Sequence, residues 1–196
     1  LEIRDCIVEN NHAIQAAGGI AILTSEPVQI NNCIIRNNES SNEAGAILVS
    51  ESTVSFSNVT FESNHAEEGA GGAVIILASD VDGYNLIFID NQSENDGSMI
   101  YMTESEYEFV HILAYNNSLN EAGFYFDYSH GQISNSTFVD NHGENSVFYI
   151  GQPSNENIIT NSIIRNNKTD EFSEQNNNYG EISIYYSNVE GEPAPE

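Results

Sequence analysis

The chain has 196 residues, of which 30 are acidic and 4 are basic, so its formal net charge is −26 at pH 7. Such a charge excludes nucleic acid and anionic membrane surfaces as direct partners, because both need a basic binding surface. Hydrophobic residues make up 39% of the chain, and no apolar run approaches the roughly 18 residues of a membrane-spanning helix. We therefore expect a folded domain with a real core.

A repeated phrase organises the chain: an apolar residue, two residues of any kind, and then Asn. The Asn residues follow one another at spacings of 27, 27, 27, 25, 25 and 25 residues. The apolar members are, in chain order, Ile7, Ile34, Phe61, Phe88, Leu113, Phe138 and Ile163, and the Asn members are Asn10, Asn37, Asn64, Asn91, Asn116, Asn141 and Asn166. The spacing predicts about seven coils of 25–27 residues each.

Each repeat holds short runs rich in Val, Ile, Phe and Tyr, separated by Asn, Ser, Glu and Gly. The run 54–61 alternates in period two, which is typical of a strand. No helical periodicity of useful length occurs. Strands this short bury a core only when each pairs with its copy in the next repeat, which predicts an all-β, single-stranded parallel β-helix.

In this fold, equivalent residues of successive coils stack at the strand spacing of about 4.8 Å. We therefore expect the seven apolar members of the phrase to form one inward column of large side chains. The seven Asn members are expected to form a ladder in a turn. Asn suits that place because it tolerates the left-handed backbone region and its amide bonds to the copies above and below.

Two phrases of the repeat carry a family resemblance. Phe-x-x-Asn stands at Phe61, Phe88 and Phe138, and Gly-Gly-Ala stands at 71–73. The repeat resembles that of the polymorphic outer membrane proteins, which are right-handed parallel β-helical adhesins of the cell surface, and the resemblance covers residues 1–170. The segment 182–191 resembles the opening of a further coil in the broader pectin-lyase-like superfamily. This resemblance implies a right-handed winding, which the general rule for parallel crossovers also favours.

Cys6 and Cys33 occupy the same place in the first two repeats. Stacked neighbours lie about 5 Å apart between Cα atoms, which is within the disulfide range. Two interpretations stay open: free thiols in a column of small side chains, or a disulfide that joins the first two coils if the protein is secreted. With two Cys and no His at a fitting spacing, we expect no metal site of the zinc type.

Acid-rich turns recur at 25–26, 50–51, 79–80 and 103–104, with Glu106 and Glu108 beyond them. On adjacent coils they are expected to form a negative stripe, which repels itself unless counterions attend. One interpretation is that calcium bridges these oxygens, since calcium accepts carboxylates in loose geometry. The other is a solvated acidic surface suited to a salty medium. We expect no other cofactor.

Patterns that point to catalysis are weak in this chain. His12, His65 and His142 belong to different repeats, so they are separated by about 10 Å or more along the axis. Asp90 and Asp140 lie two repeats apart. The motifs of polygalacturonase-like and pectate-lyase-like β-helix enzymes do not occur in the sequence. We therefore predict no catalytic residue within this segment.

Asn-x-Ser/Thr triplets begin at six positions: Asn38, Asn58, Asn91, Asn116, Asn135 and Asn167. Asn38 and Asn167 fall in polar loops of the predicted coils, whereas some of the others are ladder positions. If the source is eukaryotic, Asn38 and Asn167 are the predicted N-glycosylation sites.

We interpret residues 1–190 as a non-catalytic extracellular or cell-surface β-helix segment of a longer chain, with 191–196 as a linker or tail. Its predicted role is that of an adhesin, a structural spacer or an assembly element. The predicted partner is a glycan, a surface protein or a neighbouring copy, with Tyr101, Tyr125, Tyr128 and Tyr149 as candidate contact residues. The alternative is a segment of a polysaccharide lyase or hydrolase whose catalytic residues lie partly outside the chain.

Overall fold

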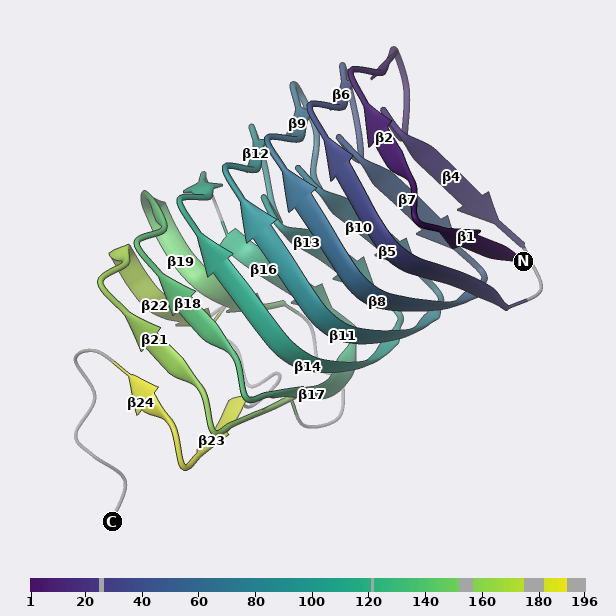
Figure 1. Ribbon diagram of the computed structural model, residues 1–196. Coiled ribbons are helices and arrows are strands. Elements are labelled where there is room, and N and C mark those ends of the chain that lie inside the picture. The colour runs from purple at the N-terminus through teal and green to yellow at the C-terminus, as the bar shows by residue number, and fades with distance from the viewer. Residues whose placement is uncertain (25–26, 121, 152–156, 175–181, 190–196) are drawn as a thin grey trace.

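Figure 1 shows the computed structural model of the chain, which describes residues 1–24, 27–120, 122–151, 157–174 and 182–189. The chain winds into a right-handed parallel β-helix of about six turns. This confirms the predicted fold class, with slightly fewer turns than the seven expected. The described residues form no helix, and therefore none that could cross a membrane. The predicted tail, 191–196, lies outside the described residues.

Two parallel sheets of 12 strands each enclose the core. The first sheet contains β1 (Glu2–Arg4), β2 (Ile7–Glu9), β5 (Val28–Arg36), β8 (Thr53–Glu62), β11 (Asp80–Ile89), β14 (Glu106–Tyr115), β17 (His130–Ser134), β18 (Thr137–Val139), β20 (Asn157–Thr160), β21 (Ile163–Arg165), β23 (Ile182–Tyr185) and β24 (Asn188–Val189). The second sheet contains β3 (His12–Ala13), β4 (Ile20–Leu23), β6 (Glu39–Ser40), β7 (Ile47–Ser50), β9 (His65–Ala66), β10 (Val74–Leu77), β12 (Gln92–Ser93), β13 (Ile100–Thr103), β15 (Ser118–Leu119), β16 (Ala122–Asp127), β19 (His142–Ile150) and β22 (Lys168–Glu174).

Strand β8 shows how the sequence pattern produces a coil. Val54 and Phe56 point into the core before Asn58, whereas Val59 and Phe61 point inward after it. Asn58 adopts a left-handed conformation with φ of 55°, and this residue reverses the parity of the alternation. One long strand therefore forms two straight halves joined by a bend, which is the corner that the winding requires.

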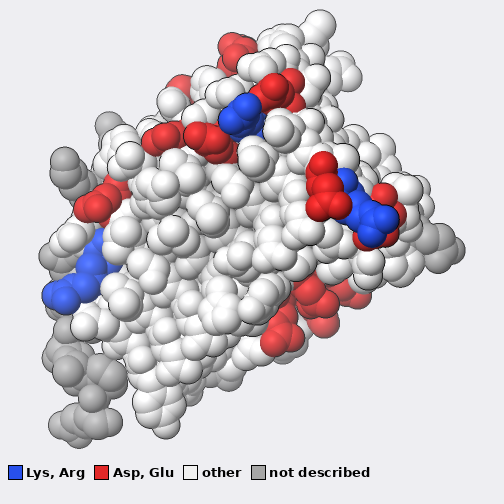
Figure 2. Space-filling model, in the orientation of Figure 1, with Lys and Arg blue, Asp and Glu red and all other residues white. Residues whose placement is uncertain are grey.

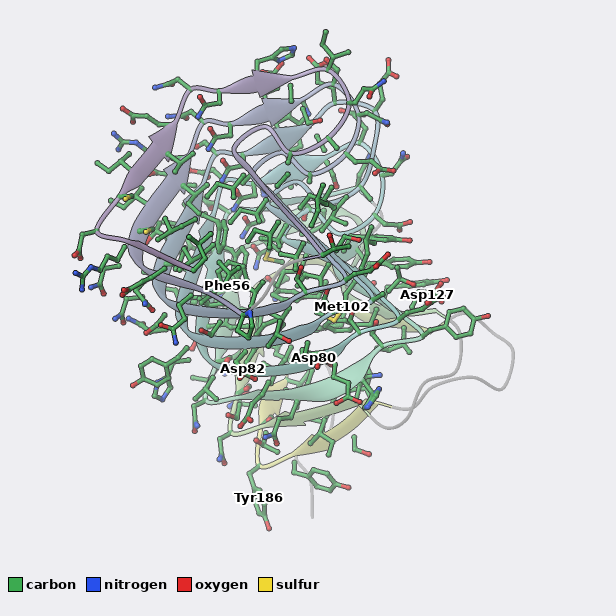
Figure 3. All side chains as sticks on the ribbon, turned by 90° about the vertical axis from the view of Figure 1, so that its right-hand side faces the viewer. Phe56, Asp80, Asp82, Met102, Asp127 and Tyr186 are labelled. Atoms are coloured by element: carbon green, nitrogen blue, oxygen red, sulfur yellow. The ribbon has the colours of Figure 1, made fainter. Side chains whose placement is uncertain are left out.

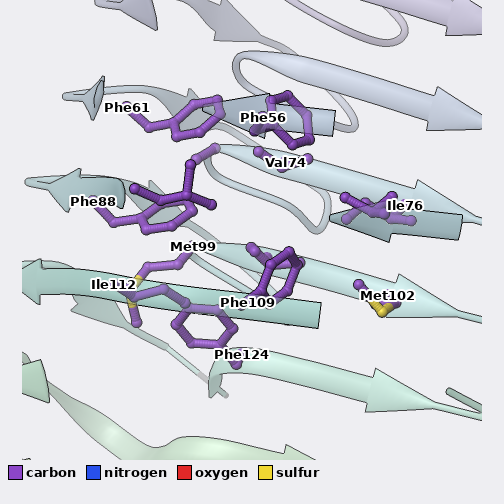
Figure 4. Close-up of a cluster of buried hydrophobic side chains, with 14 of the residues drawn as sticks. Phe56, Phe61, Val74, Ile76, Phe88, Met99, Met102, Phe109, Ile112 and Phe124 are labelled. Atoms are coloured by element: carbon purple, nitrogen blue, oxygen red, sulfur yellow. The ribbon is translucent and has the colours of Figure 1, made fainter. Parts of the chain in front are cut away.

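The core is a set of columns that run along the axis of the helix. The rings of Phe61 and Phe88 stack with their centroids 5.0 Å apart and their planes inclined by 10°. Figure 4 shows Phe61 and Phe88 in this cluster of buried side chains, together with Phe124 of the second sheet. The Phe124 ring contacts Phe88 and Phe138 edge to face, at 5.9 and 5.5 Å. These contacts join the two sheets across the interior.

In four of the seven coils, the inward residue is not the predicted one but the residue that follows it. The column consists of Val8, Ile35, Phe61, Phe88, Ala114, Phe138 and Ile164. Phe61, Phe88 and Phe138 were therefore placed correctly. The other four predicted members point outward, one residue before the inward one: Ile7, Ile34, Leu113 and Ile163. Each of these coils carries two adjacent apolar residues, and the phrase selected the first of them.

The asparagine ladder needs the same correction. Its members are Asn11, Asn38, Asn64, Asn91, Asn117, Asn141 and Asn167, and each donates Nδ2 to the Oδ1 of the next at 2.9–3.2 Å. Asn64, Asn91 and Asn141 were predicted correctly. The other four predicted Asn residues precede a ladder residue and adopt left-handed backbone with φ of 52–59°: Asn10, Asn37, Asn116 and Asn166. In the remaining coils Ser63, Asp90 and Asp140 take this left-handed position.

Candidate functional site

A groove lined by carboxylates runs along one corner of the stack, where the second sheet turns into the first. Three adjoining hollows of about 380, 210 and 340 Å³ follow this corner, and they share Asp80. We call this surface the acidic groove and define it by its lining residues Glu51, Asp80, Asp82, Glu104, Glu106, Glu108, Tyr128 and His130. Six carboxylates therefore line one continuous surface.

Register places the groove residues in rows. Asp80 pairs with Glu106 in the next coil, and Glu106 pairs with His130 in the coil after that. Asp82 is likewise in register with Glu108. Because alternate residues of a strand share a face, both rows project from the same side of the first sheet. Figure 3 shows Asp80 and Asp82 on β11.

A ladder of buried serines holds the backbone under the groove. The backbone N–H of Ser52 donates to Ser79 Oγ at 3.1 Å, that of Ser79 to Ser105 Oγ at 3.0 Å, and that of Ser105 to Ser129 Oγ at 3.1 Å. Each hydroxyl in turn donates to the carbonyl two residues earlier, at 2.7–2.9 Å. The residue before each serine has left-handed backbone, with φ of 47–50°. The corner is therefore the same in four successive coils, and the groove keeps a constant shape.

Two side chains from the following coil contact the carboxylates of the groove. His130 Nε2 lies 3.1 Å from Glu106 Oε1, and Gln132 Nε2 donates to Glu108 Oε1 at 3.0 Å. Within the described residues, no Lys or Arg forms an ion pair with a carboxylate of the groove. Like charges at the spacing of adjacent strands repel, so a cation placed there gains favourable energy from several of them.

The acid-rich turns were predicted to stack, and the structure refines which residues are equivalent. Glu51 and Glu104 occupy the left-handed position of their corners, where Ala78 and Tyr128 stand in the other coils. Asp80 belongs two positions later, in register with Thr53 and Glu106. The turn 25–26 lies outside the described residues. The serine ladder was not predicted, although Ser recurs there at spacings of 27, 26 and 24 residues.

The bridging of these acids by calcium stays a prediction. In the part of the chain that the structure describes, no group of three or more His, Cys, Asp or Glu side chains is arranged to hold a metal ion. Three of the His residues share one column, in which Glu39 separates His12 from His65, while Gln92 and Ser118 separate His65 from His142. His12 Nδ1 lies 3.3 Å from Glu39 Oε1.

Three of the four candidate tyrosines form a stacked row on the outside of the second sheet. The rings of Tyr101 and Tyr125 have centroids 5.0 Å apart, those of Tyr125 and Tyr149 are 4.6 Å apart, and both pairs are inclined by 12°. Burial raises the pKa of Tyr101 and Tyr125, with smaller contributions from Asp96 and Asp127. Because the rings cover one another's faces, they offer edges and hydroxyls rather than a flat platform for a sugar ring. Tyr128 instead stands at the groove, 49% exposed.

Asp90 and Asp140, the carboxylate pair considered for catalysis, do not converge on a common point. Both occupy exposed left-handed turn positions two coils apart, and Asn116 stands between them in the intervening coil. The structure therefore does not bring these two acids together.

Cys6 and Cys33 are stacked in successive coils, as their spacing indicates, and both are free thiols in this structure. Each thiol lies close to the carbonyl oxygen two residues earlier: Cys6 Sγ is 3.0 Å from Arg4 O, and Cys33 Sγ is 3.2 Å from Asn31 O. Cys6 is exposed and Cys33 is buried. Burial raises the pKa of Cys33.

The predicted glycosylation of Asn38 is wrong. Asn38 is fully buried in the asparagine ladder, where its Nδ2 donates to Val8 O at 2.9 Å. Asn167 is partly buried, and its Nδ2 donates to Phe138 O at 3.2 Å. Both triplets begin at the second Asn of a pair, which is the ladder residue. The exposed triplet asparagines are Asn58, Asn116 and Asn135.

No protein-family model, no curated protein and no solved structure matches the chain. The resemblance to the polymorphic outer membrane proteins therefore reduces to the coarser statement that the chain is a parallel β-helix.

Proposed function

We propose that this chain is a non-catalytic, extracellular or cell-surface module that acts as an adhesive spacer. A parallel stack with a polar ladder in its corners is stiff, because each coil is hydrogen-bonded to the coils on both sides. Such a rod holds rows of side chains at a fixed spacing of about 4.8 Å. A strongly acidic surface is least self-repulsive in a salty medium, which suits the outside of a cell.

The acidic groove is the observation that carries this proposal. Six carboxylates line adjoining hollows above a corner fixed by the serine ladder. Its sign selects a cationic ligand and disfavours an acidic glycan. We assign the groove to a basic, extended segment of a partner protein, whose Lys and Arg side chains match the rows of carboxylates.

Calorimetric titration with a Lys-rich peptide of about ten residues tests this assignment. We expect binding that weakens as the NaCl concentration rises, because the contacts are between exposed charges. The double variant Glu106→Gln with Glu108→Gln removes two charges from the groove and should weaken binding about tenfold or more. Equal binding by this variant would contradict the assignment.

The matched control removes the same charge outside the groove. Asp90→Asn with Asp140→Asn introduces the residue that already stands at this turn position in other coils, such as Asn37 and Asn116. This control should bind the peptide within about twofold of the unmodified chain. A loss as large as that of the groove variant would show that binding follows net charge alone.

The rival function, a segment of a carbohydrate-active enzyme, predicts a different result. We expect no release of reducing ends or unsaturated products when the chain is incubated with acidic and neutral polysaccharides. Product release that disappears on substitution of Asp90 or Asp140 would favour the enzyme over the spacer.

A further inference from the structure

An uncharged apolar face lies on the outside of the first sheet, over the second halves of its strands. Its side chains form two rows in register: Ile87, Leu113, Thr137 and Ile163 in the first, and Ile89, Tyr115 and Val139 in the second. Leu113 is 37% exposed and Ile163 is 46% exposed. Figure 2 shows a broad white area over this sheet, with charged side chains at its margins. We call this surface the apolar face.

Opposite charges flank the apolar part of the second row, which continues beyond Glu62 into Arg36 and Glu9, a pair joined within the chain at 2.7 Å. Glu62 is in register with Ile89 at one end, and Arg165 is in register with Val139 at the other. The row therefore reads Glu62, Ile89, Tyr115, Val139 and Arg165 across five coils. Neither Glu62 nor Arg165 takes part in an ion pair within the described residues. Rotation by 180° about Tyr115 exchanges the two charges and leaves the apolar residues opposite one another.

We propose that the apolar face is the interface of a two-fold symmetric dimer of this chain. The axis lies in the plane of the interface, parallel to the strands, and passes through Tyr115. Glu62 of each copy then faces Arg165 of the other, Ile89 faces Val139, and Tyr115 faces its own copy. A two-fold interface must be self-complementary, and this row meets that condition in both charge and apolar character.

The charge distribution favours a second copy at this face. With a net charge of −26, two copies repel wherever carboxylates face carboxylates. The apolar face carries none between its ends, and the end charges attract. This inference is independent of the acidic groove, which lies at the opposite end of the same strands.

The size of the face predicts a weak dimer. Five coils at about 4.8 Å and the four residues at about 3.3 Å between the left-handed bends at Asn85 and Asp90 give an area of roughly 320 Å² for each copy, below the usual size of specific interfaces. A dissociation constant between about 100 µM and about 1 mM is expected for such a contact. Asp90 and Asp140 stand at the rim of the face and approach each other across the two-fold axis. They oppose association.

Sedimentation velocity from about 10 µM to about 1 mM tests the dimer and its location. Leu113→Lys places an ammonium group at the centre of the face and should raise the dissociation constant at least tenfold. The matched control is Tyr84→Lys, at a residue 52% exposed on the first half of β11, and it should leave association unchanged. Both variants reduce the net negative charge equally, so general repulsion cannot explain a difference between them.

Charge reversal tests the symmetry. Arg165→Glu and Glu62→Arg should each weaken the dimer about tenfold, and the double variant should restore it to within about threefold. Asp90→Asn with Asp140→Asn should tighten it. A chain that stays monomeric at about 1 mM would overturn the proposal. A dimer that tolerates Leu113→Lys, or one that the double variant does not restore, would do the same, because the contact would then lie elsewhere.

Discussion

Asn64 donates two hydrogen bonds to one atom of Asn91: its backbone nitrogen lies 3.1 Å from Asn91 Oδ1, and its Nδ2 lies 3.0 Å from the same oxygen. Asn91 Nδ2 also donates to Phe61 O at 3.0 Å. One buried side chain thus satisfies the polar groups of a turn in the preceding coil. The arrangement repeats along the stack and makes the asparagine ladder a continuous hydrogen-bonded column.

We expect Asn91→Ala to lower the free energy of unfolding by about 3 kcal/mol or more, because the buried donors of Asn64 and the carbonyl of Phe61 lose their partner. Asn37→Ala is the control, at an exposed left-handed position; Ala17, Ala44 and Ala78 show that alanine adopts this backbone conformation at other corners of the same chain. It should cost at most about 1 kcal/mol. Urea unfolding followed by circular dichroism measures both, and equal losses would contradict the ladder.

The corrected register predicts different outcomes for two adjacent isoleucines. Ile35 is fully buried in the inward column, whereas Ile34 faces outward. Ile35→Ala should lower the free energy of unfolding by about 2–5 kcal/mol, and Ile34→Ala by less than about 1 kcal/mol. Because the substitution is the same at both sites, differential scanning calorimetry compares them directly. If Ile34→Ala lowered the free energy of unfolding more than Ile35→Ala, Ile34 would be the inward residue, as the repeated phrase indicated.

The burial of Tyr107 predicts that the protein loses stability at alkaline pH. Tyr107 is fully buried, its hydroxyl lies 2.7 Å from Asn157 Oδ1, and burial raises its pKa far above the ordinary value of 10.0. Since the folded-state pKa is the higher one, this stabilisation is fully present below pH 10 and is lost as the pH rises above it. The expected slope from this group reaches about 1.4 kcal/mol per pH unit.

Tyr107→Phe removes this titration, so its stability should fall less steeply above pH 10 even though the loss of the hydrogen bond lowers its stability at neutral pH. Tyr101 and Tyr125 titrate in both proteins and cancel in the comparison. Urea midpoints measured from about pH 8 to about pH 11.5 supply both curves. Parallel curves would show that ionisation of Tyr107 is not coupled to unfolding.

The two cysteines should react with a thiol reagent at different rates. Cys6 is exposed, whereas Cys33 is buried and its pKa is raised by that burial. Because the thiolate is the reactive form, one thiol is expected to react rapidly and the second at least about tenfold more slowly. Cys6→Ser should abolish the fast phase. If both thiols reacted equally fast, the first coils would open readily in solution. If no thiol reacted, Cys6 and Cys33 would be joined in a disulfide.

The sequence was sufficient for the winding and insufficient for its register. Repeats of about 26 residues with short apolar runs admit few folds other than a parallel β-helix, so the architecture followed from spacing alone. Register depended on choosing between neighbours of the same type, such as Ile34 and Ile35 or Asn37 and Asn38, and spacing does not distinguish them. The coils with a single Asn could have decided the choice, because Ser63, Asp90 and Asp140 mark the turn residue that precedes the ladder.

The acidic groove could be predicted only in part. Its carboxylates were recognised as acid-rich turns, but their alignment required the bend at the left-handed residue, which shifts the alternation within each coil. Tyr128 and His130 joined the groove through stacking and not through any local motif. The serine ladder beneath them consists of a common residue type in a chain rich in Ser, so its recurrence was hidden among chance matches.

Every interior coil makes the same contacts in the asparagine ladder and the inward column, because a coil pairs only with the coil before it and the coil after it. A gene could therefore lose or duplicate a segment of one repeat in frame, and the joint would still offer a matching amide and a matching apolar group. The length of the β-helix would change by one strand spacing for each repeat lost or gained. The surfaces on the remaining coils would keep their geometry. This architecture lets evolution adjust length separately from recognition.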